Sequence, residues 1–491
     1  MIRGLLNKKV ERILDLITLL EIHDGRVDFN TVYRELDSDA ATLAMDLSQA
    51  KSLFAPLFTL QKDQDLQIQY LDGNTYLNVY AYAMTHSPVC ALLEQVFFQP
   101  QQEVPDMARA LFVSTSTVYR WVDQFNQAVR PSYDVSLDTH PLHLCGDENE
   151  VRTFYTSFFK EKYPLYEWPF PALSKSELSA FLDQALPLQY AKNFLNYYQC
   201  FHIQLAVSLY RYHQGFRLPD ADLKANHRSS AAADILLAEK RTLALSSPPF
   251  PLSHDHRLYQ ELIAPFAGDL DAENFSTLLE LTATNPLANR IFLYINRLIS
   301  YLCQALSVQL DNESELVLAL YNALLGTFGK SIARSILYSP YLLYQKSIQV
   351  QFPDLCNRIL AIIRTQNQAF SLPTDPDFVG YLFYVIWSTW ENLFNQLIRP
   401  PKKIKILVIS RFSLFHARSL RQQILTYFGN LVDVSTPSEP PILLEALDLQ
   451  SYDLIVSNFK IEGLPLPCVV CDGIHSYRDY AALARAIFRF W

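Results

Sequence analysis

Hydroxyl and cationic side chains gather in the stretch Ser114-Thr-Ser-Thr-Val-Tyr-Arg120, and their spacing suits contact with DNA. A helix that reads the major groove enters it with its first turns leading, so residues just after the N-cap can touch bases and phosphates. Ser114 is a natural N-cap. Val113, Val118 and Val122 are spaced to face a core instead. The predicted DNA-contacting residues are Ser114, Thr115, Ser116, Thr117, Tyr119 and Arg120.

An earlier stretch, Asp39-Ala-Ala-Thr-Leu-Ala-Met-Asp-Leu47, has the same place in a similar pattern but fewer polar side chains. Asp39 is able to cap the first amides of a helix there. Alanines at groove-facing positions offer no hydrogen bond to a base, which leaves Thr42 and Lys51 as candidate DNA contacts. DNA contact and a purely structural role are about equally supported for this helix.

The charge of the chain opposes binding to DNA. Its 491 residues include 41 Lys and Arg against 50 Asp and Glu, a net of −9, and residues 1–160 hold 13 against 21, a net of −8. Because phosphate contacts supply most non-specific affinity, we expect a few clustered cations to make them and dimerisation to add affinity. The expected cations are Arg109, Arg120, Arg130, Lys8 and Lys9.

Two histidines in one stretch of helical period could carry a phosphoryl group. His202 and His213 are eleven residues apart, about three turns, so their rings lie on nearly one face. A neutral imidazole is nucleophilic near pH 7 and can accept phosphate from a carrier. A buried, hydrogen-bonded histidine is the competing interpretation. Between His256 and His416 there is no histidine, so no histidine switch operates there.

The cysteines indicate a reduced protein without a metal site. Seven of them are scattered along the chain, an odd number that suits a cytoplasmic location rather than a disulfide framework. Cys468-Val-Val-Cys471, with His475, supplies only three ligands, and strand alternation puts the two thiols on opposite faces. Buried strand cysteines are therefore predicted, with no metal, no cofactor and no catalytic residue.

The elements that must position these residues form two helix-turn-helix units. Twelve glycines against 64 aromatic residues favour a helical, aromatic-packed chain, and we expect no signal peptide and no membrane span. The first unit is predicted from helices at 10–20, 30–36 and 40–54 and a hairpin over 57–70. The second has helices at 88–98, 104–112, from 114 to 129 and from 148, with a wing-like segment at 136–145.

The rest of the chain changes character twice. From 168 to about 400 it is helical in period and fits two bundles of roughly 110 residues that divide near 285, followed by a proline-containing linker at 400–403. In the last 90 residues, strands alternate with helices, which predicts a small domain with a parallel sheet covered on both faces. The predicted strands are 403–410, 432–434, 453–457 and 469–471, and the helices 415–428, 441–447 and 477–490.

The order of these parts resembles the Mga/AtxA-type transcriptional regulators of Gram-positive bacteria throughout the chain. The resemblance is carried by Val113–Arg120, by Phe201-His-Ile-Gln-Leu-Ala-Val-Ser-Leu-Tyr-Arg211 and by Lys403–Ser410. It implies a multidomain, mainly α fold with a C-terminal α/β domain. The implied domains are winged helix-turn-helix units at 1–72 and 73–162, two all-α phosphotransferase-system regulatory domains (PRD) at 168–285 and 286–398, and an enzyme IIB-like α/β domain at 402–491.

The resemblance also implies regulation. Such proteins activate virulence or carbohydrate genes, self-associate as homodimers or higher oligomers, and have regulatory domains that the carrier protein HPr phosphorylates on histidine. His202 matches the acceptor position best, with His213 as the alternative. Two features depart from the pattern: Thr389 lies where the second domain would have a histidine, and the loop Arg411-Phe-Ser-Leu414 lacks the enzyme IIB cysteine. The last domain is thus expected to assemble or sense, not to transfer phosphate.

The predicted function is a cytoplasmic, DNA-binding transcription regulator, most simply an activator, and not an enzyme. Its expected partners are double-stranded promoter DNA, further copies of itself and HPr, with no membrane. The main alternative is a protein-interaction regulator whose degenerate helix-turn-helix units do not bind DNA directly. An enzyme ranks third, and an RNA-binding antiterminator would need a small β-rich N-terminus in place of the helix-turn-helix units.

Overall fold

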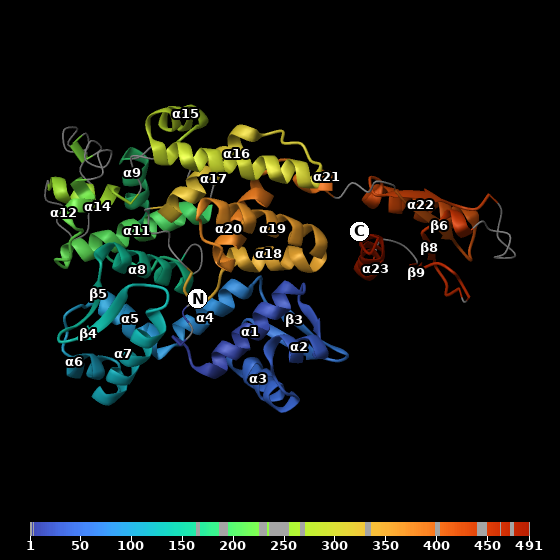
Figure 1. Ribbon diagram of the computed structural model, residues 1–491. Coiled ribbons are helices and arrows are strands. Elements are labelled where there is room, and N and C mark those ends of the chain that lie inside the picture. Colours follow the sequence, from blue (N-terminus) through green and yellow to red (C-terminus); the bar gives the residue numbers. More distant parts are fainter. Residues whose placement is uncertain are drawn as a thin grey trace. The chain divides into compact units, whose positions relative to one another are not determined.

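The chain folds into two compact units, each with its own core. Unit 1 comprises Met1–Leu302 with Asn312–Thr389, and unit 2 comprises Cys303–Asp311 with Trp390–Trp491 (Figure 1). Most of the described residues are helical, and three small sheets accompany the helices. No described helix combines the length and apolar character needed to cross a membrane. The computed structural model describes residues 2, 4–163, 167–185, 195–224, 233–234, 255–265, 271–328, 335–397, 403–438, 449–461, 463–471 and 476–490.

Unit 1 begins with a helix-turn-helix whose helices start at capped ends. The helices are α1 (Lys8–Ile22), α2 (Phe29–Leu36) and α3 (Ala40–Leu53). Asn7, Asp28 and Asp39 each accept a hydrogen bond from a first-turn amide of the helix that follows. Their apolar faces enclose one core with an antiparallel sheet in the order β1-β3-β2. The strands are β1 (Arg26–Asp28), β2 (Phe58–Lys62) and β3 (Asp65–Tyr70).

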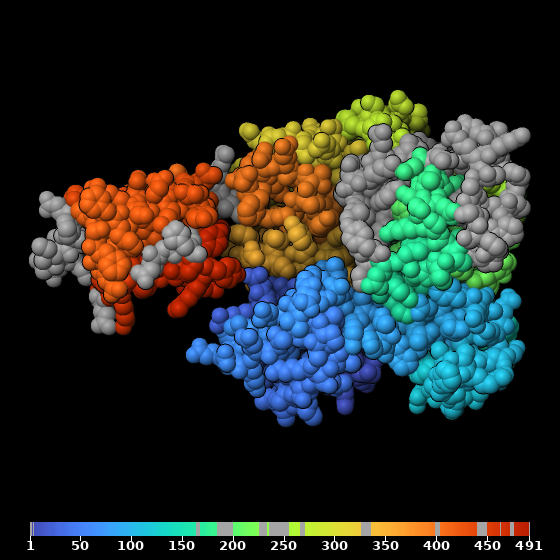
Figure 2. Space-filling model, turned by 180° about the vertical axis from the view of Figure 1, so that it is seen from behind, coloured from blue at the N-terminus to red at the C-terminus, as the bar shows by residue number. Residues whose placement is uncertain are grey.

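A second helix-turn-helix follows with its own hairpin. Five helices accompany the hairpin, and its two strands pair antiparallel from Val135 opposite Gly146 to Thr139 opposite Leu142. In Figure 2 the residues of the first helix-turn-helix, in blue, and those of the second, in cyan, form neighbouring lobes along one edge of unit 1. The elements are α4 (Tyr76–Thr85), α5 (Pro88–Phe98), α6 (Val104–Ala110), α7 (Thr115–Val129), β4 (Val135–Thr139), β5 (Leu142–Gly146) and α8 (Glu148–Lys162).

The middle of the chain is helical, and four of its helices have proline as their first residue, the position where a missing N–H costs nothing. The described helices of this middle part are α9 (Lys175–Ala185), α11 (Leu195–His213), α12 (Asp220–Lys224), α14 (His256–Ile263), α15 (Phe275–Thr284), α16 (Pro286–Leu306, which reaches into unit 2), α17 (Glu313–Phe328), α18 (Pro340–Gln351), α19 (Pro353–Phe370) and α20 (Pro376–Thr389). One continuous core joins the second helix-turn-helix to α8, α9, α11 and α14.

Unit 2 contains a four-stranded, all-parallel sheet in the order β7-β6-β8-β9. One face carries Ile404, Ile406 and Val408, which pack under two helices, and the other carries Leu407 and Ile409. The alternation along β6 thus matches the predicted two-sided sheet. The predicted helix at 441–447 lies outside the described residues. The elements are α21 (Leu393–Leu397), β6 (Ile404–Ile409), α22 (Leu414–Phe428), β7 (Val432–Ser435), β8 (Leu454–Ser457), β9 (Cys468–Val470) and α23 (Tyr477–Phe488).

Candidate nucleic-acid interface

The helix α7 is anchored by one face and capped at its start. Four of its residues, Val118, Val122, Phe125 and Val129, are buried in the core of the second helix-turn-helix. Ser114 is the N-cap, as predicted: its Oγ accepts from the amide of Thr117 at 3.2 Å. The same oxygen lies 2.8 Å from the Ser116 hydroxyl and 2.9 Å from the Thr117 hydroxyl. The cap therefore engages the hydroxyls of Ser114, Ser116 and Thr117, whereas Thr115, Tyr119 and Arg120 remain exposed.

The exposed face of α7 carries most of the residues predicted to touch DNA. Arg120 is exposed and makes no ion pair with any described residue. Tyr119 beside it is 42% exposed. Sequence reasoning missed Asp123, which is exposed one turn after Arg120, although its i,i+3 spacing was visible. A carboxylate there accepts from a cytosine amino group but repels phosphate. The exposed residues of this face are Thr115, Ser116, Tyr119, Arg120, Asp123 and Gln127.

A side-chain clamp fixes the β4–β5 hairpin against α7. Asn126 donates its Nδ2–H to the Leu137 carbonyl at 3.0 Å and accepts from the Leu137 amide at 2.7 Å. Hence one residue of the helix satisfies both backbone groups of a strand residue. At the hairpin tip, backbone amides of His140 and Thr139 hold the pKa of Asp138 below its usual value. Helix and hairpin thus form one rigid surface, which the sequence pattern alone did not indicate.

The first helix-turn-helix presents a poorer surface. Asp39 caps α3 as predicted, accepting from the Thr42 amide at 2.7 Å. The exposed face of α3 consists mainly of alanines and Ser48, with Met45 63% exposed and Lys51 further along. Three arginines around it are engaged by acids, namely Arg12 with Asp46, Arg26 with Asp65 and Arg34 with Glu35.

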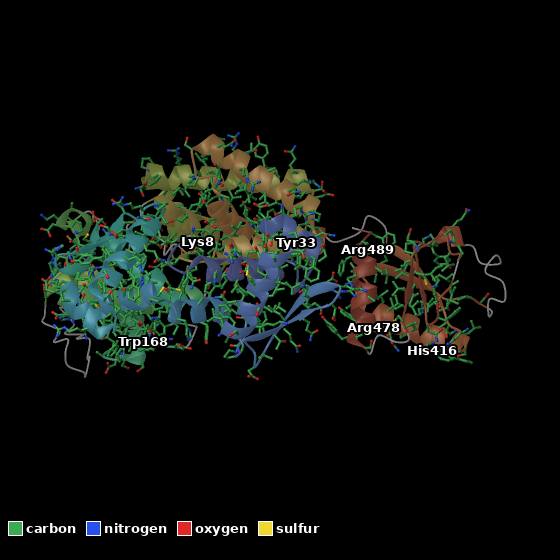
Figure 3. The ribbon with its side chains drawn as sticks, turned by 90° about the horizontal axis from the view of Figure 1, so that it is seen from below. Lys8, Tyr33, Trp168, His416, Arg478 and Arg489 are labelled. Atoms are coloured by element: carbon green, nitrogen blue, oxygen red, sulfur yellow. The ribbon has the colours of Figure 1, made fainter. Side chains whose placement is uncertain are left out.

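Few cations of the first 160 residues are free to meet phosphate. Arg109, expected to do so, pairs with Asp106 one turn earlier on α6. Gln124 of α7 donates to the Gly4 carbonyl at 2.6 Å, so α1 begins next to α7. Lys8, labelled in Figure 3, lies in the first turn of α1. The exposed cations without an ion pair to any described residue are Lys8, Lys9, Lys51, Lys62, Arg120 and Arg130.

The two candidate phosphate acceptors lie on one helix but in different surroundings. His202 is only 2% exposed. His213, at the last turn of α11, is partly exposed. Partial burial lowers the pKa of His213 below its usual value, and the nearby Arg217 charge lowers it further. His213 is therefore mostly neutral at pH 7 and is more exposed as a residue than His202, although its Nε2 atom is buried.

A buried ion-pair network joins the helix-turn-helix to α11. The Glu148 carboxylate accepts from Arg152 Nε at 2.9 Å and from Arg211 Nη2 at 2.6 Å. Arg152 also donates to Glu261 of α14 at 2.6 Å, and Arg257 donates to the same carboxylate at 3.0 Å. Because α8 follows the β5 strand directly, these pairs connect the hairpin, α11 and α14. Only the two i,i+4 pairs, Glu148 with Arg152 and Arg257 with Glu261, were visible in the sequence.

Unit 2 offers no metal centre among its described residues. Cys471 packs in the core under α22 and α23, while Cys468 packs on the other face of the sheet, as alternation along a strand predicts. Neither cysteine forms a disulfide, and His475 lies outside the described residues. In the loop after β6, the Ser410 hydroxyl lies 2.9 Å from Nδ1 of His416, which Figure 3 labels.

Comparison with known proteins agrees with this geometry. Residues 73–159, from just before α4 through most of α8, match the Mga helix-turn-helix domain. A trans-acting regulator of Streptococcus pneumoniae serotype 4 is 22% identical over 468 residues, which is 94% of this chain and 93% of that protein. The capsule synthesis positive regulators AcpA and AcpB of Bacillus anthracis are 18% and 22% identical. The AcpA match covers 36% of this chain and 37% of AcpA, and the AcpB match covers 43% of each protein.

These relatives are regulators and not enzymes, as the sequence predicted for this chain. The helix-turn-helix match falls on the elements that hold the exposed face of α7. These matches support the assignment of the chain as a Mga/AtxA-type regulator.

Proposed function

We propose that the chain activates transcription by binding double-stranded promoter DNA, with α7 in the major groove and the β4–β5 hairpin on the adjacent backbone. The observation that carries this proposal is the exposed face of α7, a helix anchored in the core. This face carries Thr115, Ser116 and Arg120, and Arg120 makes no ion pair with any described residue. Arginine reads guanine by two hydrogen bonds or holds a phosphate, and hydroxyls bind either. The positive regulators among the relatives support activation.

Mobility-shift titration with promoter fragments at two salt concentrations tests the proposal. Arg120→Ala should weaken binding by about 1–3 kcal/mol. If Arg120 holds a phosphate, the variant also lowers the slope of log K against log salt by about 0.9. Arg364→Ala is the matched control, because Arg364 is an exposed arginine of α19 that makes no ion pair with any described residue. Absence of any retarded fragment at low salt, for the wild type, refutes the DNA-binding proposal.

The first helix-turn-helix is assigned a supporting role. Its α3 offers Thr42 and Lys51 to DNA, and Lys62 extends from its hairpin. The exposed Met45 and the alanines around it favour the alternative function, in which this unit contacts protein instead of bases. If a Lys51→Ala variant binds DNA as tightly as the wild type at every salt concentration, the result favours a protein-contacting role for the first helix-turn-helix.

We propose that the phosphotransferase system regulates the protein through α11. In this proposal residues 168–285 and 286–398 are the two PRD-type domains, and HPr is the phosphodonor. The resemblance puts the acceptor at His202, but the burial of that ring would require α11 to move before a donor could reach it. The His213 residue is partly exposed, although its Nε2 atom is buried. A phosphoryl group would add about two negative charges close to Arg217 and to the Glu148 network.

Phosphate incorporation from HPr distinguishes the two histidines. We expect labelling of the wild type, and loss of labelling in either His202→Ala or His213→Ala identifies the acceptor. The second variant serves as the control for the first because both side chains lie on α11. Unchanged labelling in both variants contradicts the assignment to α11.

Unit 2 is proposed as an enzyme IIB-like assembly domain that supports homodimers or higher oligomers. Its parallel sheet and the loop without cysteine after β6 are compatible with a fold that has lost phosphate transfer. Large apolar side chains are exposed on it, among them Phe415 at 80% and Tyr477 at 87%. Sedimentation of the wild type against Phe415→Ser and Tyr477→Ser should show weaker self-association. Such a regulator acts in the cytoplasm, which agrees with seven cysteines that form no disulfide.

A further inference from the structure

We infer that the exposed ring of Phe112 is an apolar contact to DNA, made to a thymine methyl group or a deoxyribose beside the bases that α7 reads. The inference rests on the proposed function and adds a residue to it. Phe112 lies in the turn between α6 and α7, two positions before the N-cap Ser114. Its side chain is 95% exposed, more than any other large apolar side chain among the described residues.

The backbone at Phe112 is strained. Its φ is +57°, and the amides of Phe112 and Val113 donate to the carbonyls of Arg109 at 3.2 Å and Ala108 at 2.9 Å. This pair of bonds is the Schellman arrangement that ends a helix, in which the left-handed position is normally glycine. Among the described residues, every other non-glycine residue with positive φ is Asp, Asn, Ser or Gln. A bulky aromatic there is an outlier.

The first helix-turn-helix shows that the turn does not need an aromatic side chain. Asp37, at the end of α2, has the same left-handed conformation with φ +45° and lies two positions before its N-cap Asp39. Aspartate tolerates this left-handed conformation, and its polar side chain is well solvated when exposed. Phe112 instead combines backbone strain with apolar exposure, and no packing by the described residues compensates for either. A strained residue of this kind points to a functional role.

The neighbours of Phe112 fix where the ring can reach. Leu111 and Val113 pack against the core, so the backbone on both sides is held in place. The ring therefore projects beside the first turn of α7, where Thr115 and Ser116 are exposed. Because this turn leads the helix into the groove, the ring meets the apolar parts of DNA, and thymine methyl groups are a known target of phenylalanine.

The test compares Phe112→Gly with the wild type on a promoter fragment that the wild type retards. Glycine relieves the left-handed strain, so the thermal midpoint should stay the same or rise. Affinity should fall about fivefold or more. The slope of log K against log salt should not change, because no phosphate contact is lost. Arg120→Ala, by contrast, should lower affinity and, if it holds a phosphate, the slope.

Two further variants keep the result interpretable. Asp37→Gly is the matched control, because Asp37 has the same turn position in the first helix-turn-helix. This variant should bind DNA like the wild type. Phe112→Asn keeps a side chain that tolerates positive φ and should lose affinity as Phe112→Gly does. If both Phe112 variants bind as tightly as the wild type, the inference is overturned while the proposed function survives. If the wild type retards no fragment, the proposed function itself fails.

Discussion

Replacing Glu148 by Gln should destabilise unit 1 more than any change to a surface ion pair. Glu148 accepts three hydrogen bonds, one from Arg152 and two from Arg211, and both guanidinium groups are nearly inaccessible to water. The buried network balances these two cations with Glu148 and Glu261. Glutamine has almost the same volume, so the substitution removes charge without opening a cavity.

The expected loss of stability in Glu148→Gln follows from the hydrogen-bonding groups that the glutamine side chain leaves beside the two arginines. Glutamine keeps one acceptor oxygen, but its amide group turns two donors toward arginines that are themselves only donors. One buried positive charge is then uncompensated. Removing one partner of a buried ion pair costs about 3–5 kcal/mol, which is a large part of the roughly 5–15 kcal/mol that holds a domain folded.

Urea unfolding followed by circular dichroism measures this loss, and hydrogen exchange of α8 and α11 amides locates it. Glu35→Gln is the matched control, because Glu35 pairs with Arg34 where the two side chains are 51% and 70% exposed. That pair should contribute less than about 1 kcal/mol. A loss below about 1 kcal/mol in Glu148→Gln would refute the view that this network holds α8 to α11.

Three further predictions concern single side chains. Ser114→Ala removes the cap of α7 and should cost about 1 kcal/mol in urea unfolding; an unchanged midpoint would contradict the capping role. Asn126→Ala leaves both backbone groups of Leu137 unsatisfied, and about 1–3 kcal/mol of stability should be lost together with protection of the Leu137 amide from hydrogen exchange. Burial raises the pKa of Glu161 to about 7, above its ordinary 4.5, so the folded state binds the extra proton and stability falls as pH rises between those values. The fall should be about 3 kcal/mol and absent in Glu161→Gln, and equal pH profiles would refute it.

Sequence reasoning found the elements whose signals are local. The caps Asp39 and Ser114 and the apolar spacing behind them predicted where α3 and α7 begin, because a cap and its helix need only adjacent residues. The three-residue strand β1 was missed because it exists only through pairing with β3, some forty residues away. The helix α4 was missed because its buried residues run almost continuously, which hides the period of 3.6.

For the candidate site, residue type was predictable but surroundings were not. The exposed face of α7 followed from helix geometry, and the pairing of Arg109 with Asp106 could have been read from its i,i+3 spacing. The burial of His202 depends on tertiary packing around α11, and the strain at Phe112 depends on how α6 ends. Neither property can be predicted from the type or spacing of the neighbouring residues in the sequence.

The ion pairs within residues 1–160 limit how many cations can contact DNA phosphates. Pairing removes cations as well as anions, since Arg12, Arg26, Arg34, Arg109 and Arg152 all face carboxylates. Six exposed cations remain without a described ion-pair partner. If all six met phosphates, log K would fall with log salt at a slope of about −5 per chain. A measured slope near −10 would require two chains on one site, whereas a slope near zero would mean that α7 does not dock on the DNA backbone at all.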